Sequence, residues 1–78
     1  MSLEFAILTA LSMCGDYLEP EPALHAGVNR LLGRRPTLTE LRAACGKLEA
    51  SQQILALDHP DNGRRYKITD NGRARLLE

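Results

Sequence analysis

The stretch RRYKITDNGRARL, residues 64–76, combines the end of a predicted β-hairpin with the start of a predicted helix. Apolar and polar residues alternate in YKIT, so Tyr66 and Ile68 should lie on one side of a strand and Lys67 on the other. Thr69 closes the alternation and is a typical residue for a helix N-cap. The stretch therefore predicts a cationic strand that leads directly into a short C-terminal helix.

An apolar run of strand length, ILALD at residues 54–58, precedes this stretch. Pro60 and the pair Asn62-Gly63 separate the two runs, and these residue types are typical of a tight turn. We therefore expect a two-stranded β-hairpin over residues 54–69.

Three helices are predicted upstream of the hairpin. The first covers residues 3–14, where apolar residues recur at helical spacing and Gly15 is a stop signal. The second begins near residues 21–23 and ends at Gly33. The third covers residues 38–51. The apolar stripes of these helices should form the core: Leu3, Ile7, Leu8, Leu11 and Cys14, then Leu24, Val28, Leu31 and Leu32, then Leu38, Leu41, Ala44, Cys45 and Leu48.

The segment TLTE immediately before and within the third helix is a capping box, with Thr37 as the N-cap and Glu40 as its partner. This structural role explains both residues. In the acidic connector DYLEPEP, Pro20 excludes a helix interior, and Tyr17 and Leu18 could form a short strand.

The chain has 78 residues and a mass of 8.6 kDa, which allows one domain, residues 1–78. Cys14 and Cys45 occupy apolar, helix-like surroundings, so we expect reduced thiols in a cytoplasmic protein, with a single buried disulfide as the alternative. No signal peptide is apparent, and no apolar run approaches the ~18 residues of a membrane span.

The net charge of the chain is zero, but the charges are unevenly distributed. Residues 1–28 carry four acidic and no basic residues, whereas residues 29–78 carry ten basic and six acidic residues. This asymmetry is compatible with one cationic and one acidic face, or with a surface of mixed charge.

Helix, helix, short turn, helix, hairpin and helix follow one another in the order of a winged helix-turn-helix, an α+β fold that is mainly α. The segments LRAACGKLEASQQI and DNGRRYKITDNGRARL resemble the winged-helix domains of bacterial transcriptional regulators of the MarR and PadR families. The matching residues are Leu48, Glu49, Arg64, Arg65, Tyr66, Ile68, Thr69 and Gly72. The sequence departs from the pattern at Gln52 and Gln53, where these families commonly have a glycine followed by Leu or Ile.

The resemblance implies double-stranded DNA as the partner, with residues 38–51 in the major groove and the hairpin, residues 54–69, on the phosphate backbone. The expected readers on the helix are Thr39, Arg42, Ala43 and Lys47. Arg64, Arg65 and Lys67 on the wing, and Arg34 and Arg35 in the preceding turn, are expected near phosphates. This interpretation requires Arg42, Lys47, Arg64, Arg65 and Lys67 to share one face.

Each cation also has a simpler interpretation. Arg64, Arg65 and Lys67 could form a solvated, charged hairpin that resists aggregation. Arg34 and Arg35 could balance the acidic first half of the chain. Gly46 lies in the middle of the third predicted helix, where glycine is unfavourable. Either another backbone packs closely against this position, or the helix tolerates the cost.

A single domain of this size contacts little DNA, so we expect a homodimer, with residues 3–14 as the dimer element. Phe5, Ala6 and Ala10 lie off the main stripe of that helix. The alternative function is a winged helix that binds another protein and no DNA. No catalytic constellation, cofactor motif or metal-ligand spacing is apparent, so we expect no enzyme activity, no cofactor and no metal site.

Overall fold

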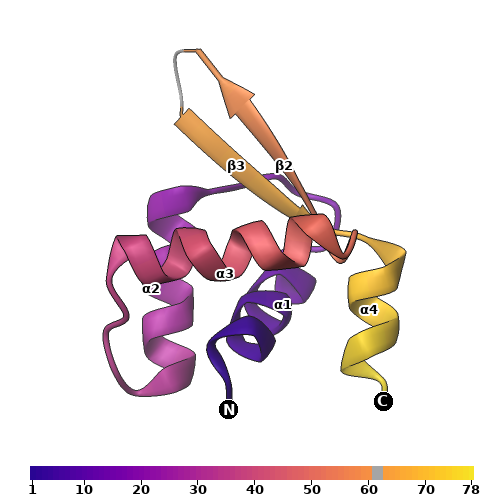
Figure 1. The fold of residues 1–78 in the computed structure, drawn as a ribbon, viewed down its shortest axis with the longest axis horizontal. Coiled ribbons are helices and arrows are strands. Elements are labelled where there is room, and N and C mark those ends of the chain that lie inside the picture. Colours follow the sequence, from indigo (N-terminus) through magenta and orange to yellow (C-terminus); the bar gives the residue numbers. More distant parts are fainter. Residues whose placement is uncertain (61–62) are drawn as a thin grey trace.

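The computed structural model describes residues 1–60 and 63–78 and has four helices and three strands over these ranges. In Figure 1, α3 crosses in front of α1, and the hairpin of β2 and β3 projects away from the helices. Asn62, half of the predicted turn pair, lies outside the described residues. The elements are α1 (Leu3–Met13), β1 (Glu19–Pro20), α2 (Glu21–Leu32), α3 (Leu38–Ala50), β2 (Ile54–His59), β3 (Gly63–Ile68) and α4 (Asp70–Leu76).

The helix ends agree with the local signals in the sequence. The side chain of Ser2 caps α1, and Gly33 ends α2 with a left-handed φ of 67°. The capping box of α3 is complete, because Thr37 Oγ1 accepts from the Glu40 amide and Glu40 Oε1 accepts from the Thr37 amide. Short-range hydrogen bonds of this kind satisfy amides that have no partner within the helix.

The sheet has three strands in the order β1-β3-β2, with both pairings antiparallel. The prediction of a two-stranded wing is therefore incomplete, and the predicted strand at Tyr17 and Leu18 is displaced to Glu19 and Pro20. A strand of two residues has no periodicity that could reveal it, and it forms because Glu19 lies opposite Tyr66 and Pro20 opposite Arg65.

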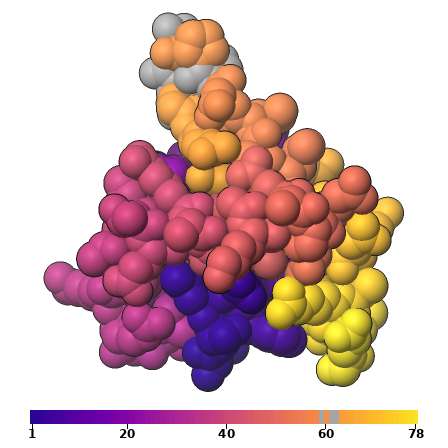
Figure 2. Space-filling model, in the orientation of Figure 1, coloured from indigo at the N-terminus to yellow at the C-terminus, as the bar shows by residue number. Residues whose placement is uncertain are grey.

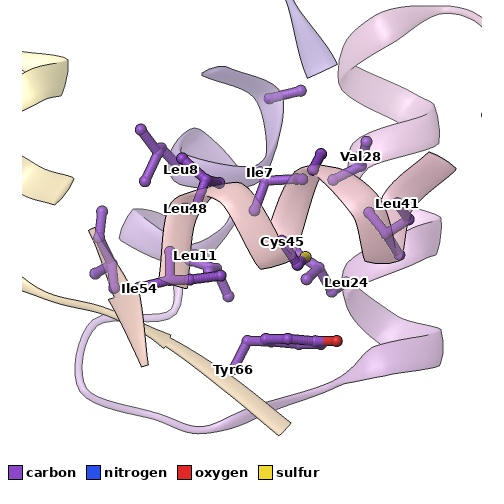
Figure 3. Packing of buried hydrophobic residues seen from close by; sticks show 13 residues of the cluster. Ile7, Leu8, Leu11, Leu24, Val28, Leu41, Cys45, Leu48, Ile54 and Tyr66 are labelled. Atoms are coloured by element: carbon purple, nitrogen blue, oxygen red, sulfur yellow. The ribbon is translucent and has the colours of Figure 1, made fainter. Parts of the chain in front are cut away.

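The core lies between α1, α2, α3 and the inner face of the sheet. Figure 3 shows the ring of Tyr66 packed beneath Cys45 and Leu24. Two predicted core positions are wrong, since Leu31 and Leu38 are 36% and 37% exposed at the ends of their helices. The buried hydrophobic residues are Ala6, Ile7, Leu8, Leu11, Leu24, Val28, Leu41, Ala44, Cys45, Leu48, Ile54, Tyr66 and Ile68.

The departure at Gln52 and Gln53 has a structural explanation. Gln52 adopts a left-handed φ of 60°, which turns the chain sharply between α3 and β2. The backbone oxygens of both glutamines then accept hydrogen bonds from Thr69, at 2.6 Å from its hydroxyl and 3.1 Å from its amide. Gly72 packs directly against this turn. The exit of α3 and the start of α4 therefore hold each other in place.

Candidate nucleic-acid interface

The outer face of α3 is solvent-exposed along its length. Thr39, Ala43, Gly46 and Lys47 all lie exposed on this helix, and Figure 2 shows α3 uncovered across the front of the molecule. A Cβ atom added at Gly46 would meet no atom within 4 Å. No packing within the described residues therefore requires this glycine, and three of the four residues are small enough for a close approach by another molecule.

The turn between α2 and α3 presents two exposed arginines. His25 of α2 holds this turn, because its Nε2 lies 2.6 Å from the backbone oxygen of the buried Pro36. A carbonyl oxygen can only accept, so this nitrogen carries the proton. Arg35 and Arg34 are exposed, and Arg34 is 3.9 Å from Glu40. This anchored turn places both cations beside the N-terminus of α3.

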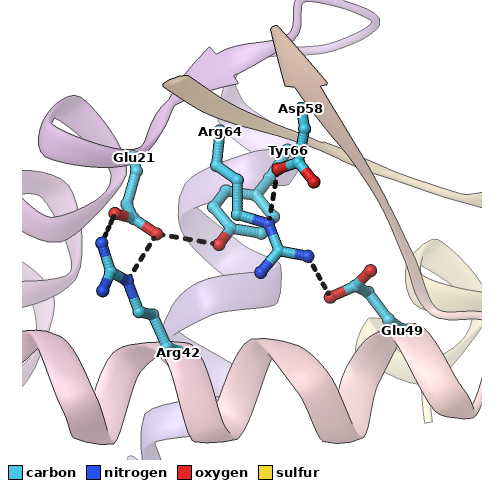
Figure 4. Close-up of polar contacts among 6 residues, drawn as sticks. All are labelled: Glu21, Arg42, Glu49, Asp58, Arg64 and Tyr66. Atoms are coloured by element: carbon cyan, nitrogen blue, oxygen red, sulfur yellow. Dashed lines mark hydrogen bonds and ion pairs between the residues drawn. The ribbon is translucent and has the colours of Figure 1, made fainter. Parts of the chain in front are cut away.

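Arg42, a predicted reader, is engaged within the protein. Its Nη2 and Nε donate to the two carboxylate oxygens of Glu21 at 3.0 and 3.3 Å (Figure 4). These bonds from Arg42 lower the pKa of Glu21 against the opposing effect of burial, and a hydrogen bond from Tyr66 lowers it further. The side chain of Glu21 is only 11% exposed, whereas that of Arg42 is 55% exposed. Arg42 therefore compensates a largely buried carboxylate.

Arg64 occupies the space between the wing and α3. Its Nε lies 3.1 Å from Asp58 across the hairpin, and its Nη2 lies 3.5 Å from Glu49 on α3. The guanidinium also stands 5.9 Å from the centre of the Tyr66 ring. As Figure 4 shows, Arg64 faces the protein and has a carboxylate partner on each side.

Arg65 and Lys67 project from the opposite face of the sheet. Arg65 Nη1 donates to the backbone oxygen of Leu18 at 3.3 Å, and Lys67 Nζ lies 3.9 Å from Asp16. Neighbouring residues on a strand point to opposite faces, so Arg64 cannot share a face with them. The five residues Arg42, Lys47, Arg64, Arg65 and Lys67 therefore do not all lie on one face, as the interpretation from the sequence requires.

Three cations have neither an ion pair nor a hydrogen-bond partner among the residues that the structure describes: Arg30, Arg35 and Lys47. Sequence reasoning did not single out Arg30. It also missed Glu21 and Glu49 as partners of Arg42 and Arg64. Residues 30–39 contain three arginines and no acidic residue, a local signal that could have directed attention to the turn.

Much of the apolar surface of the predicted dimer helix is buried within the chain, although Met13 at its end is exposed. Ala6, one of its three residues off the main stripe, is completely buried within the chain, and Phe5 and Ala10 are half-buried. Both cysteines are free thiols, Cys45 buried and Cys14 half-buried. Over residues 1–60 and 63–78, no group of three or more acidic, His or Cys side chains could hold a metal ion. None of the described helices is long and apolar enough to cross a membrane.

Comparisons with known proteins find similarity at the level of structure alone. No protein-family model and no curated protein matches the chain. RosR of H. salinarum superposes with a TM-score of 0.84 at 14% identity, over 99% of this chain and 67% of RosR. BpsR of Bordetella bronchiseptica, whose DNA binding is regulated by 6-hydroxynicotinic acid, gives 0.77 at 16% identity, over 99% of this chain and 51% of BpsR.

MarR of E. coli, in its reduced form, superposes with a TM-score of 0.70 at 18% identity, over 99% of this chain and 52% of MarR. These solved structures are winged-helix proteins of the MarR type. The chain has a winged-helix fold. The resemblance seen in the sequence is thus confirmed for the fold, and the chain spans about half of BpsR and of MarR and two thirds of RosR.

Proposed function

We propose that this chain is a DNA-binding domain of a transcriptional regulator and that α3 enters the major groove. The observation that carries the proposal is the uncovered face of α3, made of small residues and Lys47, beside a turn with two exposed arginines. The winged-helix fold, shared with a protein whose DNA binding is known to be regulated, supports the same function.

In this proposal Thr39, Ala43 and Lys47 contact base edges or the adjacent backbone. Arg34 and Arg35 contact phosphates, and Arg30 extends their patch. Gly46 allows a DNA strand to approach the helix backbone, which would explain a glycine at a position where a side chain would have space. Because phosphate contacts release counterions, the exposed arginines of the turn contribute most of the salt-dependent affinity.

The wing has a secondary role in this proposal. The hairpin over residues 54–69 lies along the phosphate backbone, but its cations and Arg42 are already engaged. Arg42 and Arg64 contact DNA only if they exchange their carboxylate partners for phosphates. Arg65 and Lys67, on the outer face, remain proposed contacts only where the DNA reaches around the wing. Binding therefore depends less on these four residues than on the turn.

Two matched substitutions test the position of the interface. Ala43 on α3 and Ala74 on α4 are both exposed helix alanines, so glutamate at either position should leave the fold intact. Ala43→Glu places a negative charge against DNA and should weaken duplex binding roughly tenfold or more. Ala74→Glu should leave affinity nearly unchanged. Fluorescence anisotropy with a labelled duplex measures both, and equal affinities of the two variants would contradict the proposal.

The homodimer through residues 3–14 stays a prediction. The structure leaves Phe5 and Ala10 half-exposed on this helix, and Met13 is exposed at its end. Substitution of Met13 and Phe5 by alanine tests this element directly, since a dimer held together by α1 would then dissociate.

A second candidate function is a winged helix that binds another protein. The observation that favours it is the charge between α3 and the wing, where the carboxylates of Glu21, Glu49 and Asp58 pair with the guanidinium groups of Arg42 and Arg64 (Figure 4). Three carboxylates against two guanidiniums make this space a poor site for phosphate. Failure to bind duplex DNA at ~50 mM salt would favour this function over the first.

A further inference from the structure

The outer face of the wing carries apolar surface that the DNA-binding function does not use. Leu55 and Leu57 of β2 are each 46% exposed. Their partners across the hairpin are Lys67 and Arg65, so all four side chains lie on the face turned away from α3. On a strand of six residues, two large apolar side chains therefore stand next to each other in solvent.

β2 is also an edge strand, because the sheet order is β1-β3-β2. Edge strands are commonly protected by a lysine, a proline or a charge that points inward. The strand ILALDH contains no lysine or proline, and Arg64 neutralises its inward-pointing charge, Asp58. The unpaired backbone of β2 is thus next to two exposed leucines, Leu55 and Leu57, and the charge of Asp58 lies on the other face of the strand.

We propose that a second copy of this chain pairs its β2 with this edge, antiparallel, and that a two-fold axis passes through Ala56. The pattern Leu-Ala-Leu is symmetric about Ala56, so Leu55 would lie opposite Leu57 of the second copy, and the reverse. An isologous interface requires this kind of self-complementary surface. The result is a six-stranded sheet with a cluster of four leucines on its outer face.

The charges around the leucines favour a second copy over an acidic partner. Arg65 donates to Leu18, and Lys67 is near Asp16, so both cations are engaged within the chain. An acidic peptide would have to compete for these cations. A second β2 contributes only leucine, alanine and backbone groups at the centre of the contact. The inference rests on this edge alone and is independent of DNA binding.

Sedimentation velocity of the full chain from about 1 to 200 µM tests the proposal. The wild type should form a concentration-dependent dimer, and Leu57→Lys should raise the dimer dissociation constant roughly tenfold or more. The matched control is Leu77→Lys, which changes a leucine just after α4 that is 88% exposed. A monomeric wild type would overturn the proposal, as would a dimer whose dissociation constant Leu57→Lys leaves unchanged or changes no more than Leu77→Lys does.

Cysteine cross-linking tests the register separately. In a Cys14→Ser background, Leu55→Cys and Leu57→Cys are prepared as single variants. Residues directly opposite are about 5 Å apart between Cβ atoms, whereas diagonal ones are about 7 Å apart. An equimolar mixture of the two variants should therefore form mixed disulfide dimers, and each variant alone should form few. Equal cross-linking of the mixture and the single variants would contradict the proposed register.

Discussion

The hydroxyl of Tyr66 donates a 3.0 Å hydrogen bond to Oε2 of Glu21, although the two residues are 45 positions apart. The same carboxylate accepts both bonds from Arg42. One side chain at the start of α2 thus joins the wing strand β3 to the helix proposed to enter DNA. The orientation of α3 relative to the wing, and hence the proposed interface, depends on this junction.

The Tyr66–Glu21 bond should contribute measurably to stability. Tyr66→Phe removes only the hydroxyl and leaves a largely buried carboxylate with one donor fewer. We expect the free energy of unfolding to fall by about 1–3 kcal/mol, because hydrogen bonds to charged groups are stronger than neutral ones. Urea denaturation followed by circular dichroism measures this. Tyr17→Phe is the control, since Tyr17 is exposed and should change stability by less than about 0.5 kcal/mol.

The lowered pKa of Glu21 predicts a pH dependence. A carboxyl group with a lower pKa in the folded state stabilises the protein above its unfolded pKa of about 4.3, and this contribution is lost as pH falls through the folded value. Glu21→Gln should therefore destabilise the protein most near pH 7 and progressively less below about pH 4. Denaturation from pH 3 to pH 7 measures the difference. A constant difference over this range would show that Glu21 does not titrate in this way.

Two glycines should respond oppositely to alanine. A Cβ at Gly72 would collide with the backbone oxygen of Gln53 and lie 2.7 Å from Ile68 Cγ1, so Gly72→Ala should cost about 1–3 kcal/mol. Gly46 is open and helical, so Gly46→Ala should stabilise by about 0.5–1 kcal/mol. Thermal denaturation compares them. If DNA approaches Gly46, the same stabilised variant should bind duplex DNA more weakly than the wild type.

The thiol of Cys14 should react slowly despite its partial exposure. Burial and a 2.9 Å hydrogen bond to Glu19 raise its pKa to about 11, and burial raises that of Cys45 to about 12. Since the thiolate is the reactive form, Glu19→Gln should increase the rate at which Cys14 reacts with a disulfide reagent at pH 8. The rate at which Cys45 reacts with the same reagent should not change. Equal rates for Cys14 in the wild type and the variant would show that Glu19 does not control this thiol.

Features that depend on neighbouring residues could be predicted from the sequence. The cap at Thr37, the end of α2 at Gly33 and the alternation through Tyr66 and Ile68 involve contacts over a few residues. The order of these elements then led to the winged-helix fold. Apolar positions at the ends of helices, such as Leu38, were harder to assign because periodicity does not show where the core stops.

The partners of the cations could not be predicted in the same way. Arg42 meets Glu21 across 21 residues and Arg65 meets Leu18 across 47, and no local pattern encodes such pairs. Strand alternation alone, however, separates Arg64 from Arg65 and Lys67, and it could have been applied to the wing cations as it was to Tyr66. The sequence also pointed to Arg34 and Arg35 in the turn, and their contact with DNA stays a prediction.

The salt dependence of duplex binding shows whether the turn between α2 and α3 contacts DNA phosphates. Three proteins are titrated into a labelled duplex between about 50 and 200 mM salt. They are the wild type, the turn double variant Arg34→Ala/Arg35→Ala and the α4 double variant Arg73→Ala/Arg75→Ala. The last variant removes the same charge from α4. We expect the wild type to bind the duplex. The slope of log K against log salt should be smaller by about 2 in the turn variant and unchanged in the α4 variant. No binding at about 50 mM salt, or equal slopes for the two double variants, would contradict this expectation.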